Sequence, residues 1–232
     1  MKKLLYDSIC GKGKRPQNED SFAIIDHQAE GRWLGIVCDG MGGHTQGDVA
    51  SQLVVDAVTE RWEKENTEPD SEEKIIRTCK YTYELFEQKV KELHHAQMGT
   101  TLVMVSIENN KLTIAHLGDS RCYVFNKDGK LEYVTQDHIA IQDGIEKITK
   151  CFFSYRPEVI RPEITQMDLK EGSSILICSD GVYRYIPSVT IKRFITKDCS
   201  PKESLALLGD YCSKISKDNY TAILLKVLPE NG

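Results

Sequence analysis

The hydrophobic periodicity of this chain changes along its length, and that change constrains the fold more than any other feature. Apolar runs typical of short β-strands come first and are expected to form a meander; they are LLYDSIC, SFAIID and RWLGIVCD at residues 4–10, 21–26 and 32–39. From Asp48 the apolar residues recur every three or four positions, over residues 49–58 and again over 75–93. This spacing predicts two helices, and Asp70 or Ser71 offers the N-cap of the second.

Strand-like segments return in the second half of the chain. Residues 99–137 contain the turn signals ENNK and NKDGK, which divide this stretch into a second meander of about four strands. Residues 137–162 are rich in charge and proline and are expected to be irregular, and EITQMDL and SSILICSD after them are expected to form another pair of strands. Helical patterns at residues 189–195 and 202–214 precede a closing strand, YTAILLKVL.

This order of segments predicts the fold class. Runs of strands separated by a pair of helices favour packed antiparallel sheets with helices outside over an alternating parallel sheet. With 232 residues, of which 40% are hydrophobic, the chain is long enough to bury a substantial core. Because no repeat or linker marks a boundary, we expect residues 1–232 to form a single domain.

Charge and composition argue against several classes of protein. A net charge of -5, a pI near 5.7 and a longest basic cluster of residues 12–15 argue against binding to nucleic acid or to an anionic membrane. The first apolar stretch ends at Asp7 and is too short for the apolar region of a signal peptide. No uncharged run reaches the roughly 20 residues of a membrane helix. The eight cysteines lack zinc-site spacings, and Cys38 and Cys178 are expected to be core residues. We therefore expect a cytoplasmic protein.

Acidic residues recur where the apolar segments stop. They are Glu19, Asp20, Asp39, Asp119, Asp180 and Asp218. Each one alone is typical of an ordinary turn, because Asp-Gly is a common turn dipeptide. Brought together, however, several carboxylates would repel and raise the pKa of one another unless a cation held them. Ligands that are all oxygen favour a hard cation such as Mg²⁺ or Mn²⁺ over zinc or copper.

Seven short motifs carry a resemblance to a known family. They are RPQNEDS, DGMGGH, GTTLV, GDSR, TQDH, SDGV and DNYT, in this order over nearly the whole chain. Each motif is weak alone, but together they resemble the metal-dependent protein serine/threonine phosphatases of type 2C, in their bacterial form. The resemblance implies an α+β fold, a sandwich of two antiparallel β-sheets flanked on both sides by α-helices, which agrees with the pattern of segments.

The resemblance also implies catalytic roles for the direct metal ligands. Asp39 would bridge two divalent cations, Mn²⁺ or Mg²⁺, and the backbone carbonyl of Gly40 would bind one of them. Asp180 and Asp218 would complete the protein ligands of the other. Asp119, together with Asp180, matches the position of a possible third, weaker metal.

Three further residues would serve the same site. Glu19 and Asp20 match family positions that hold metal-bound water, and because adjacent strand residues point to opposite faces, Glu19 is the expected site member. Arg15 matches the phosphate-binding arginine of the family. A guanidinium suits a phosphate monoester because it can donate two parallel hydrogen bonds to its oxygens.

The implied reaction is the hydrolysis of phosphoserine and phosphothreonine in proteins. Two divalent cations ~3.5–4 Å apart lower the pKa of a bridging water and hold a hydroxide in line with phosphorus, so no covalent intermediate is needed. This agrees with a sequence that contains neither a G-x-S-x-G elbow nor a P-loop. The expected partners are phosphorylated proteins and a cognate serine/threonine kinase, in signalling.

The chain departs from the family pattern in two places, and two alternative functions stay open. Met41 stands where many animal members have a histidine proposed as general acid, although His44 lies nearby. Residues 139–162 look shorter and less regular than the flap region of the family. The alternatives are a non-catalytic phosphatase-like regulatory or binding module, and a dimetal hydrolase of another phosphoester.

Overall fold

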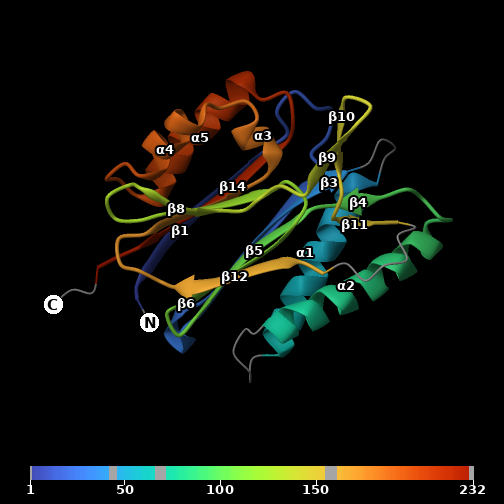
Figure 1. The fold of residues 1–232 in the computed structure, drawn as a ribbon, viewed down its shortest axis with the longest axis horizontal. Helices are drawn as coiled ribbons and strands as arrows, with labels where there is room; N and C mark the ends of the chain where they lie inside the picture. The colour runs from blue at the N-terminus through green and yellow to red at the C-terminus, as the bar shows by residue number, and fades with distance from the viewer. Residues whose placement is uncertain (1, 42–45, 66–71, 155–160, 230–232) are drawn as a thin grey trace.

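Two antiparallel sheets lie face to face in the middle of the molecule, with helices on both outer faces (Figure 1). The structure is a computed structural model that describes residues 2–41, 46–65, 72–154 and 161–229. One sheet has seven strands, which are β2 (Asp20–His27), β3 (Arg32–Met41), β4 (Gly99–Thr100), β5 (Leu102–Glu108), β6 (Lys111–Leu117), β11 (Phe152–Phe153) and β12 (Glu163–Asp168). The other has five, which are β1 (Leu4–Gly11), β7 (Arg121–Phe125), β8 (Leu131–Val134), β13 (Ser174–Cys178) and β14 (Tyr220–Val227).

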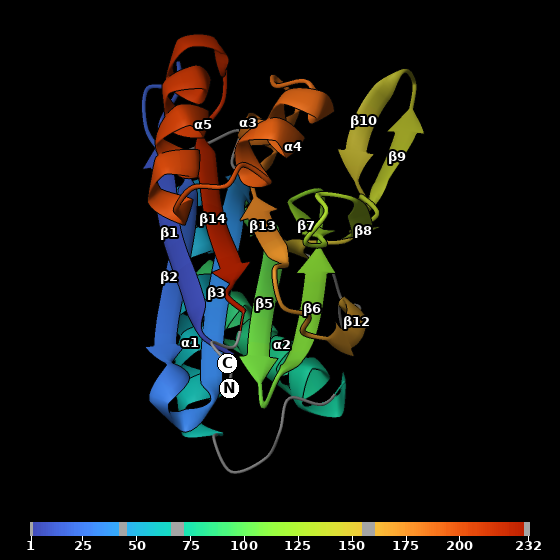
Figure 2. The ribbon, with the colours of Figure 1, turned by 90° about the vertical axis from the view of Figure 1, so that its left-hand side faces the viewer.

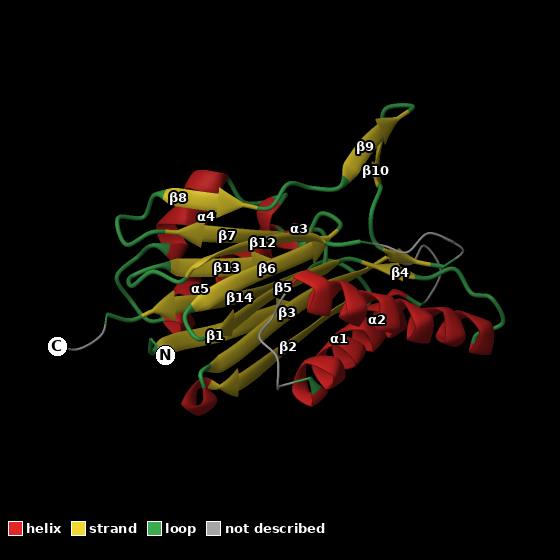
Figure 3. Cartoon of the chain, turned by 60° about the horizontal axis from the view of Figure 1, so that its bottom comes forward, coloured by secondary structure: helices red, strands yellow, loops and turns green. Residues whose placement is uncertain are grey.

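The helices divide between the two outer faces. The seven-stranded sheet is covered by α1 (Gly47–Lys64) and α2 (Glu72–Glu92), which lie across it side by side (Figure 3). The five-stranded sheet is covered by α3 (Asp180–Tyr183), α4 (Ser188–Ile195) and α5 (Pro201–Ile215). A short 3-10 turn (Gln28–Glu30) joins β2 to β3. The predicted sandwich with helices on both sides is therefore confirmed.

Three layers of apolar side chains hold this arrangement together. Val37 and Ile223 lie in the core between the sheets, Ile36 packs toward α1 and α2, and Leu224 packs toward α4 and α5. Neighbouring strand residues thus face different cores, which explains why these strands read as continuous apolar runs. Cys38 and Cys178 are buried core residues, as predicted. In the described part of the chain, no helix has the length and apolar content to cross a membrane.

Strand pairing differs from the expected meanders in three places. β1 pairs with β14 in one sheet, whereas β2 pairs with β3 in the other, so the first three strands form no meander. The second group was expected to have about four strands and has β5 to β8 besides the two-residue β4, but β5–β6 and β7–β8 belong to different sheets. β12 pairs with β6, and β13 lies between β7 and β14, so these two strands form no pair. The hydrophobic pattern of a strand indicates which of its faces are buried. Because strands of both sheets bury residues in the same core, this pattern does not indicate which strand is the partner.

The stretch expected to be irregular contains a regular hairpin. β9 (Ile139–Gln142) and β10 (Ile145–Ile148) pair antiparallel around a turn at Asp143 and Gly144, whose φ angles are 53° and 75°. An Asp-Gly pair suits a tight hairpin turn because both central residues need positive φ. The hairpin stands away from the two sheets (Figure 2). The helices at 189–195 and 202–214 are confirmed, and the N-cap expected at Asp70 or Ser71 lies outside the described residues.

Candidate metal centre

An acidic pocket of about 260 Å³ lies where β3 and β13 end and β14 begins. Its lining residues are Arg15, Glu19, Asp39, Gly40, Met41, Asp119, Ile148, Asp180, Asp218 and Asn219. Five of these are carboxylates, and one is basic. All the residues expected at the site except Asp20 therefore meet at this one pocket, although they come from five separate parts of the sequence. His44 lies outside the described residues.

Main-chain hydrogen bonds fix Asp39 near the end of β3. Its carbonyl oxygen accepts from the N–H of Thr101 and from the hydroxyl of Thr100, both at 3.0 Å, and its own N–H donates to Oγ1 of Thr101 at 2.9 Å. A Cβ atom on the next residue, Gly40, would lie 2.2 Å from the carbonyl oxygen of Gly47 at the start of α1. The close approach of β3 to α1 therefore requires glycine there, directly beside Asp39.

The two adjacent acids at the start of β2 take different positions. Glu19 lines the pocket, whereas Asp20 does not. Asp20 lies opposite Asp39 in the pairing of β2 with β3, and its buried carboxylate accepts a hydrogen bond from the hydroxyl of Ser179 at 2.7 Å. Asp20 therefore lies outside the lining of the pocket, and its charge contributes to the raised pKa of Asp39.

Burial and mutual repulsion raise the pKa of the central carboxyls. Burial first, and then the charges of Asp20 and Asp180, raise the pKa of Asp39 well above its ordinary value of 3.8. Burial raises the pKa of Asp20 to about 7, against the opposite effect of hydrogen bonds from neighbouring hydroxyls. Burial and then the charge of Asp119 raise the pKa of Asp180 to about 6. A divalent cation would offset this repulsion, and the all-oxygen donor set suits Mg²⁺ or Mn²⁺.

Arg15 reaches the pocket from the loop between β1 and β2. Its Nη2 atom lies 2.7 Å from Oδ2 of Asp218, and its side chain is 54% exposed. The other carboxylate oxygen of Asp218 accepts the N–H of Asn219 at 2.9 Å, which fixes the acid. A guanidinium carries five N–H donors, so the bond to Asp218 orients Arg15 and leaves donors for a ligand.

Asn219 holds the loop that carries Arg15, a role that the sequence did not reveal. Its side-chain NH₂ group donates to the carbonyl oxygens of Lys12 at 3.0 Å and Gln17 at 2.9 Å, and its Oδ1 accepts the N–H of Glu19 at 2.9 Å. These bonds tie the start of β14 to both ends of the loop. The signal was present in the motif DNYT, but only Asp218 was selected from it.

Arg184 is a second residue that the sequence did not reveal. It follows α3, four residues after Asp180, and its Nε atom lies 2.8 Å from Oδ2 of Asp180. Its Nη2 atom lies 3.0 Å from Oδ2 of Asp119, and its Nη1 atom lies 2.8 Å from Oε2 of Glu146 in β10. Helical spacing of four from Asp180 was the available signal for the first contact, whereas the other two depend on tertiary structure.

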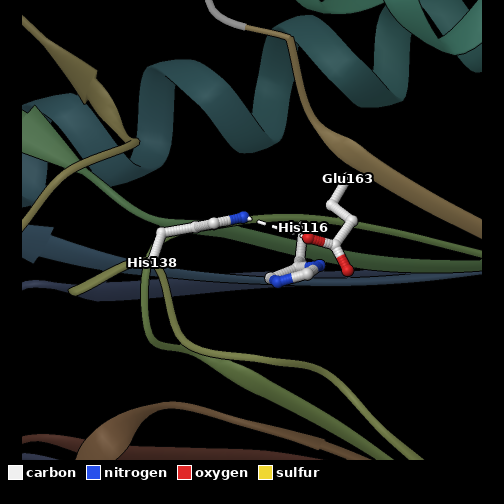
Figure 4. Close-up of side chains that lie close together, drawn as sticks. All are labelled: His116, His138 and Glu163. Atoms are coloured by element: carbon white, nitrogen blue, oxygen red, sulfur yellow. Dashed lines mark ion pairs between the residues drawn. The ribbon is translucent and has the colours of Figure 1, made fainter.

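A second group of possible metal ligands lies at the edge of the sandwich, where potential ligand atoms of His116, His138 and Glu163 lie within 4.8 Å of one another (Figure 4). The N–H of Gly118 donates to Nδ1 of His138 at 3.2 Å, so in the neutral ring Nε2 carries the proton. That nitrogen faces Oε2 of Glu163 at 3.4 Å. A metal bound at Nε2 would require this proton to move to Nδ1, whose N–H would then oppose the N–H of Gly118. Nδ1 of His116 and Nε2 of His138 are buried, and neither makes a hydrogen bond among the described residues.

The chain matches one family over almost its whole length. A sequence model of the family "Protein phosphatase 2C" matches residues 13–228. Serine/threonine phosphatase Stp of Listeria innocua is 25% identical over 91% of each chain, and protein phosphatase PhpP of Streptococcus pneumoniae is 26% identical over 94% of this chain and 95% of its own. The structure of the catalytic domain of serine/threonine protein phosphatase PstP with two manganese ions has a TM-score of 0.82 and 27% identity, over 97% of this chain and 99% of that one. The chain therefore belongs to the protein phosphatase 2C family, and it is a protein phosphatase of the serine/threonine type.

Proposed function

We propose that this chain hydrolyses phosphoserine and phosphothreonine in proteins, with two divalent cations, Mn²⁺ or Mg²⁺, in the acidic pocket. The observation that carries this is the convergence of five carboxylates and one arginine on a single pocket. Asp39 is close enough to the other acids for their charges to raise its pKa, and it would bridge the two ions, one of which would also bind the carbonyl of Gly40. Asp180 and Asp218 would bind the second ion, and Glu19 would order its surrounding water.

The chain's own residues position the phosphate in this reaction. Arg15 would donate to the phosphoryl oxygens while Asp218 holds its guanidinium in place. When bound, two divalent cations lower the pKa of the water between them and neutralise charge that develops on the phosphoryl group. Met41 lines the pocket but has no proton to give, so it does not protonate the serine or threonine oxygen that leaves.

The size of the pocket supports a protein substrate that lies mostly outside it. A volume of about 260 Å³ is below the roughly 300–1,000 Å³ of sites that enclose a whole small molecule. The pocket therefore suits a phosphorylated side chain, with the rest of the substrate on the surface around it. Two relatives of this chain are a serine/threonine phosphatase and a protein phosphatase, which supports phosphorylated proteins as substrates. A cognate serine/threonine kinase would supply these substrates. The family match over residues 13–228 supports one phosphatase domain in residues 1–232.

Phosphate release measured with and without Mn²⁺ tests this function. The substrates are a phosphothreonine peptide, p-nitrophenyl phosphate and a set of phosphorylated metabolites, and the variants are Asp39→Asn and Asp180→Asn. Asp210→Asn is the matched control, because that acid is exposed on α5. We expect Mn²⁺-dependent release from the peptide by the wild type and the control, with loss of at least ~100-fold in both site variants, as for removal of a group that stabilises transition-state charge.

Three results would contradict the proposed function. Release by the folded wild type from none of the substrates, in the presence of Mn²⁺, would leave a binding module without catalysis. Release from metabolites but not from the peptide would make the chain a hydrolase of another phosphoester. Release that persists in EDTA would exclude the dependence on divalent cations.

A further inference from the structure

Arg184 places a fixed positive charge between two of the carboxylates at the pocket. It contacts Asp180 at 2.8 Å and Asp119 at 3.0 Å, each through a different nitrogen of its guanidinium. The Asp119 side chain is only 4% exposed. Because an arginine side chain in a protein does not lose its proton, this charge is present at every working pH.

Arg184 binds Oδ2 of both Asp119 and Asp180, so a divalent cation shared by these acids would have to take the same oxygens or the second oxygen of each carboxylate, beside the guanidinium. Such ions bind oxygen at roughly 2.0–2.6 Å, which is closer than a hydrogen-bonded guanidinium nitrogen. An ion and the guanidinium contacting the same pair of carboxylates would lie close together and repel each other. The three nitrogens of Arg184 would lose their partners if it were displaced.

We propose that Arg184 takes the place of a third divalent cation, so that this chain binds two such ions. The guanidinium supplies the positive charge that Asp119 and Asp180 require. This inference rests on the two-cation pocket proposed above.

The same guanidinium also fixes the hairpin beside the pocket. Its Nη1 atom lies 2.8 Å from Oε2 of Glu146 in β10, and Ile148 at the end of that strand lines the pocket. Asp119 is held from a second direction, because the hydroxyl of Tyr183 donates to its carbonyl oxygen at 2.9 Å. A metal ion in place of Arg184 would leave Glu146 without this contact. The ion pair between Arg184 and Glu146 can therefore position the hairpin whether or not a metal ion is bound at the pocket.

Counting the bound ions tests this inference directly. The full chain is stripped of metal, and bound Mn²⁺ is measured by equilibrium dialysis with elemental analysis, up to a concentration that saturates the wild type. We expect two ions per chain for the wild type and three for Arg184→Met, which removes the charge but keeps an unbranched side chain comparable with the aliphatic part of arginine. Arg184→Lys keeps the charge and is expected to bind two.

The controls separate this inference from the proposed function. The double variant Arg184→Met with Asp119→Asn is expected to return to two ions, and Arg184→Gln serves as a second neutral variant if Arg184→Met does not fold. Three ions in the wild type or in Arg184→Lys, or two ions in both neutral variants, would overturn the role of Arg184 and leave the phosphatase function intact. A folded wild type that binds no Mn²⁺ would overturn both.

Discussion

At the scale of single residues, the pocket depends on side chains that hold other side chains in place. Asp218 orients the side chain of Arg15. Asn219 holds the loop that carries Arg15, through two donated hydrogen bonds to residues 202 and 207 positions earlier in the chain. A ligand such as phosphate therefore meets a guanidinium whose direction is already set. Preorganisation of this kind lowers the entropic cost of binding, because the side chain does not have to be ordered when the ligand arrives.

Replacing Arg15 tests whether it contacts the phosphate. Arg15→Gln removes charge-assisted hydrogen bonds, and one such bond is worth about 1.5–3 kcal/mol. Because about 1.4 kcal/mol is a factor of ten, the loss of a single bond should lower kcat/KM for a phosphothreonine peptide by roughly 10- to 150-fold, and the loss of two should lower it further. Arg193→Gln on the outer surface of α4 is the matched control and should leave kcat/KM unchanged. Equal values for Arg15→Gln and the wild type would exclude the phosphate contact.

The sequence predicted the acids of the site better than the residues that support them. Acidic residues at strand ends, read with the motif series, selected every carboxylate that lines the pocket. Asn219 and Arg184 were missed, because most of their partners lie far away in the sequence and their residue types are ordinary in turns and on helix ends. The buried carboxylate of Asp20 accepts a hydrogen bond from Ser179, 159 residues later in the chain, and local pattern does not describe a contact of this kind.

At the scale of elements, the short helix α3 brings two ligand-bearing segments together. Gly181 lies at its start, directly after Asp180, and a Cβ atom there would lie 1.8 Å from the carbonyl oxygen of Asn219. That oxygen belongs to the backbone, so it cannot rotate away as a side chain could. The separation between Asp180 and Asp218 is therefore set by backbone contact across position 181.

Two glycine-to-alanine changes should shift stability in opposite directions. Gly181→Ala forces the two segments apart and should lower the free energy of unfolding by ~1–3 kcal/mol or more. Gly209→Ala is the control. Gly209 lies within helix α5, and an added Cβ would make an ordinary van der Waals contact with Ile9 at 3.5 Å. Gly209→Ala should raise the free energy of unfolding by about 0.5–1 kcal/mol, since glycine is unfavourable in a helix. Urea unfolding of the metal-free proteins measures both, and equal midpoints for the two variants would contradict the contact at Gly181.

Periodicity predicted the elements well and their pairing poorly. The four long helical segments and the long strands were expected at their observed places, because each buries a continuous face. The partner of β1 is β14, at the other end of the chain. Nothing in the segment LLYDSIC indicates that its partner strand is β14 and not the neighbouring β2. The β9–β10 hairpin was predictable in principle, since IQDGIE holds an Asp-Gly turn signal between β-branched residues. The charge of its neighbours led to the expectation of irregular structure.

At the scale of the whole molecule, the sandwich gathers negative charge at one end. The two sheets bury apolar residues along their length and bring acids from five parts of the sequence to the pocket. Such a concentration of carboxylates destabilises the metal-free fold when all of them are ionised. Bound cations and the folded state should therefore stabilise each other.

The metal-free protein should lose stability from these acids as the pH rises. The folded pKa of Asp20 is about 7 and that of Asp180 about 6, both above the ordinary value of 3.8, so the folded state binds protons more tightly than the unfolded state. Their stabilising contribution is complete below about pH 3.8 and is lost as the pH rises to about 7. Thermal unfolding in EDTA between pH 5 and pH 8 measures this.

Comparison with Asp20→Asn isolates the contribution of one group. The variant cannot titrate at that position, so its melting temperature should fall less steeply with pH than that of the wild type. Added Mn²⁺ should raise the melting temperature of the wild type more at pH 8 than at pH 5, because protons compete with the metal for the carboxylates. Parallel pH profiles for the two proteins in EDTA would contradict the raised pKa of Asp20.

The position of bound metal tests the central claim most directly. Crystals of the wild type soaked with Mn²⁺ should show two anomalous-difference peaks ~3.5–4 Å apart in the acidic pocket, on either side of the Asp39 carboxylate and with Asp180 and Asp218 beside one of them. Peaks at the group of His116, His138 and Glu163 alone, or an acidic pocket without manganese at saturating concentration, would contradict the assignment of this pocket as the metal centre of the phosphatase.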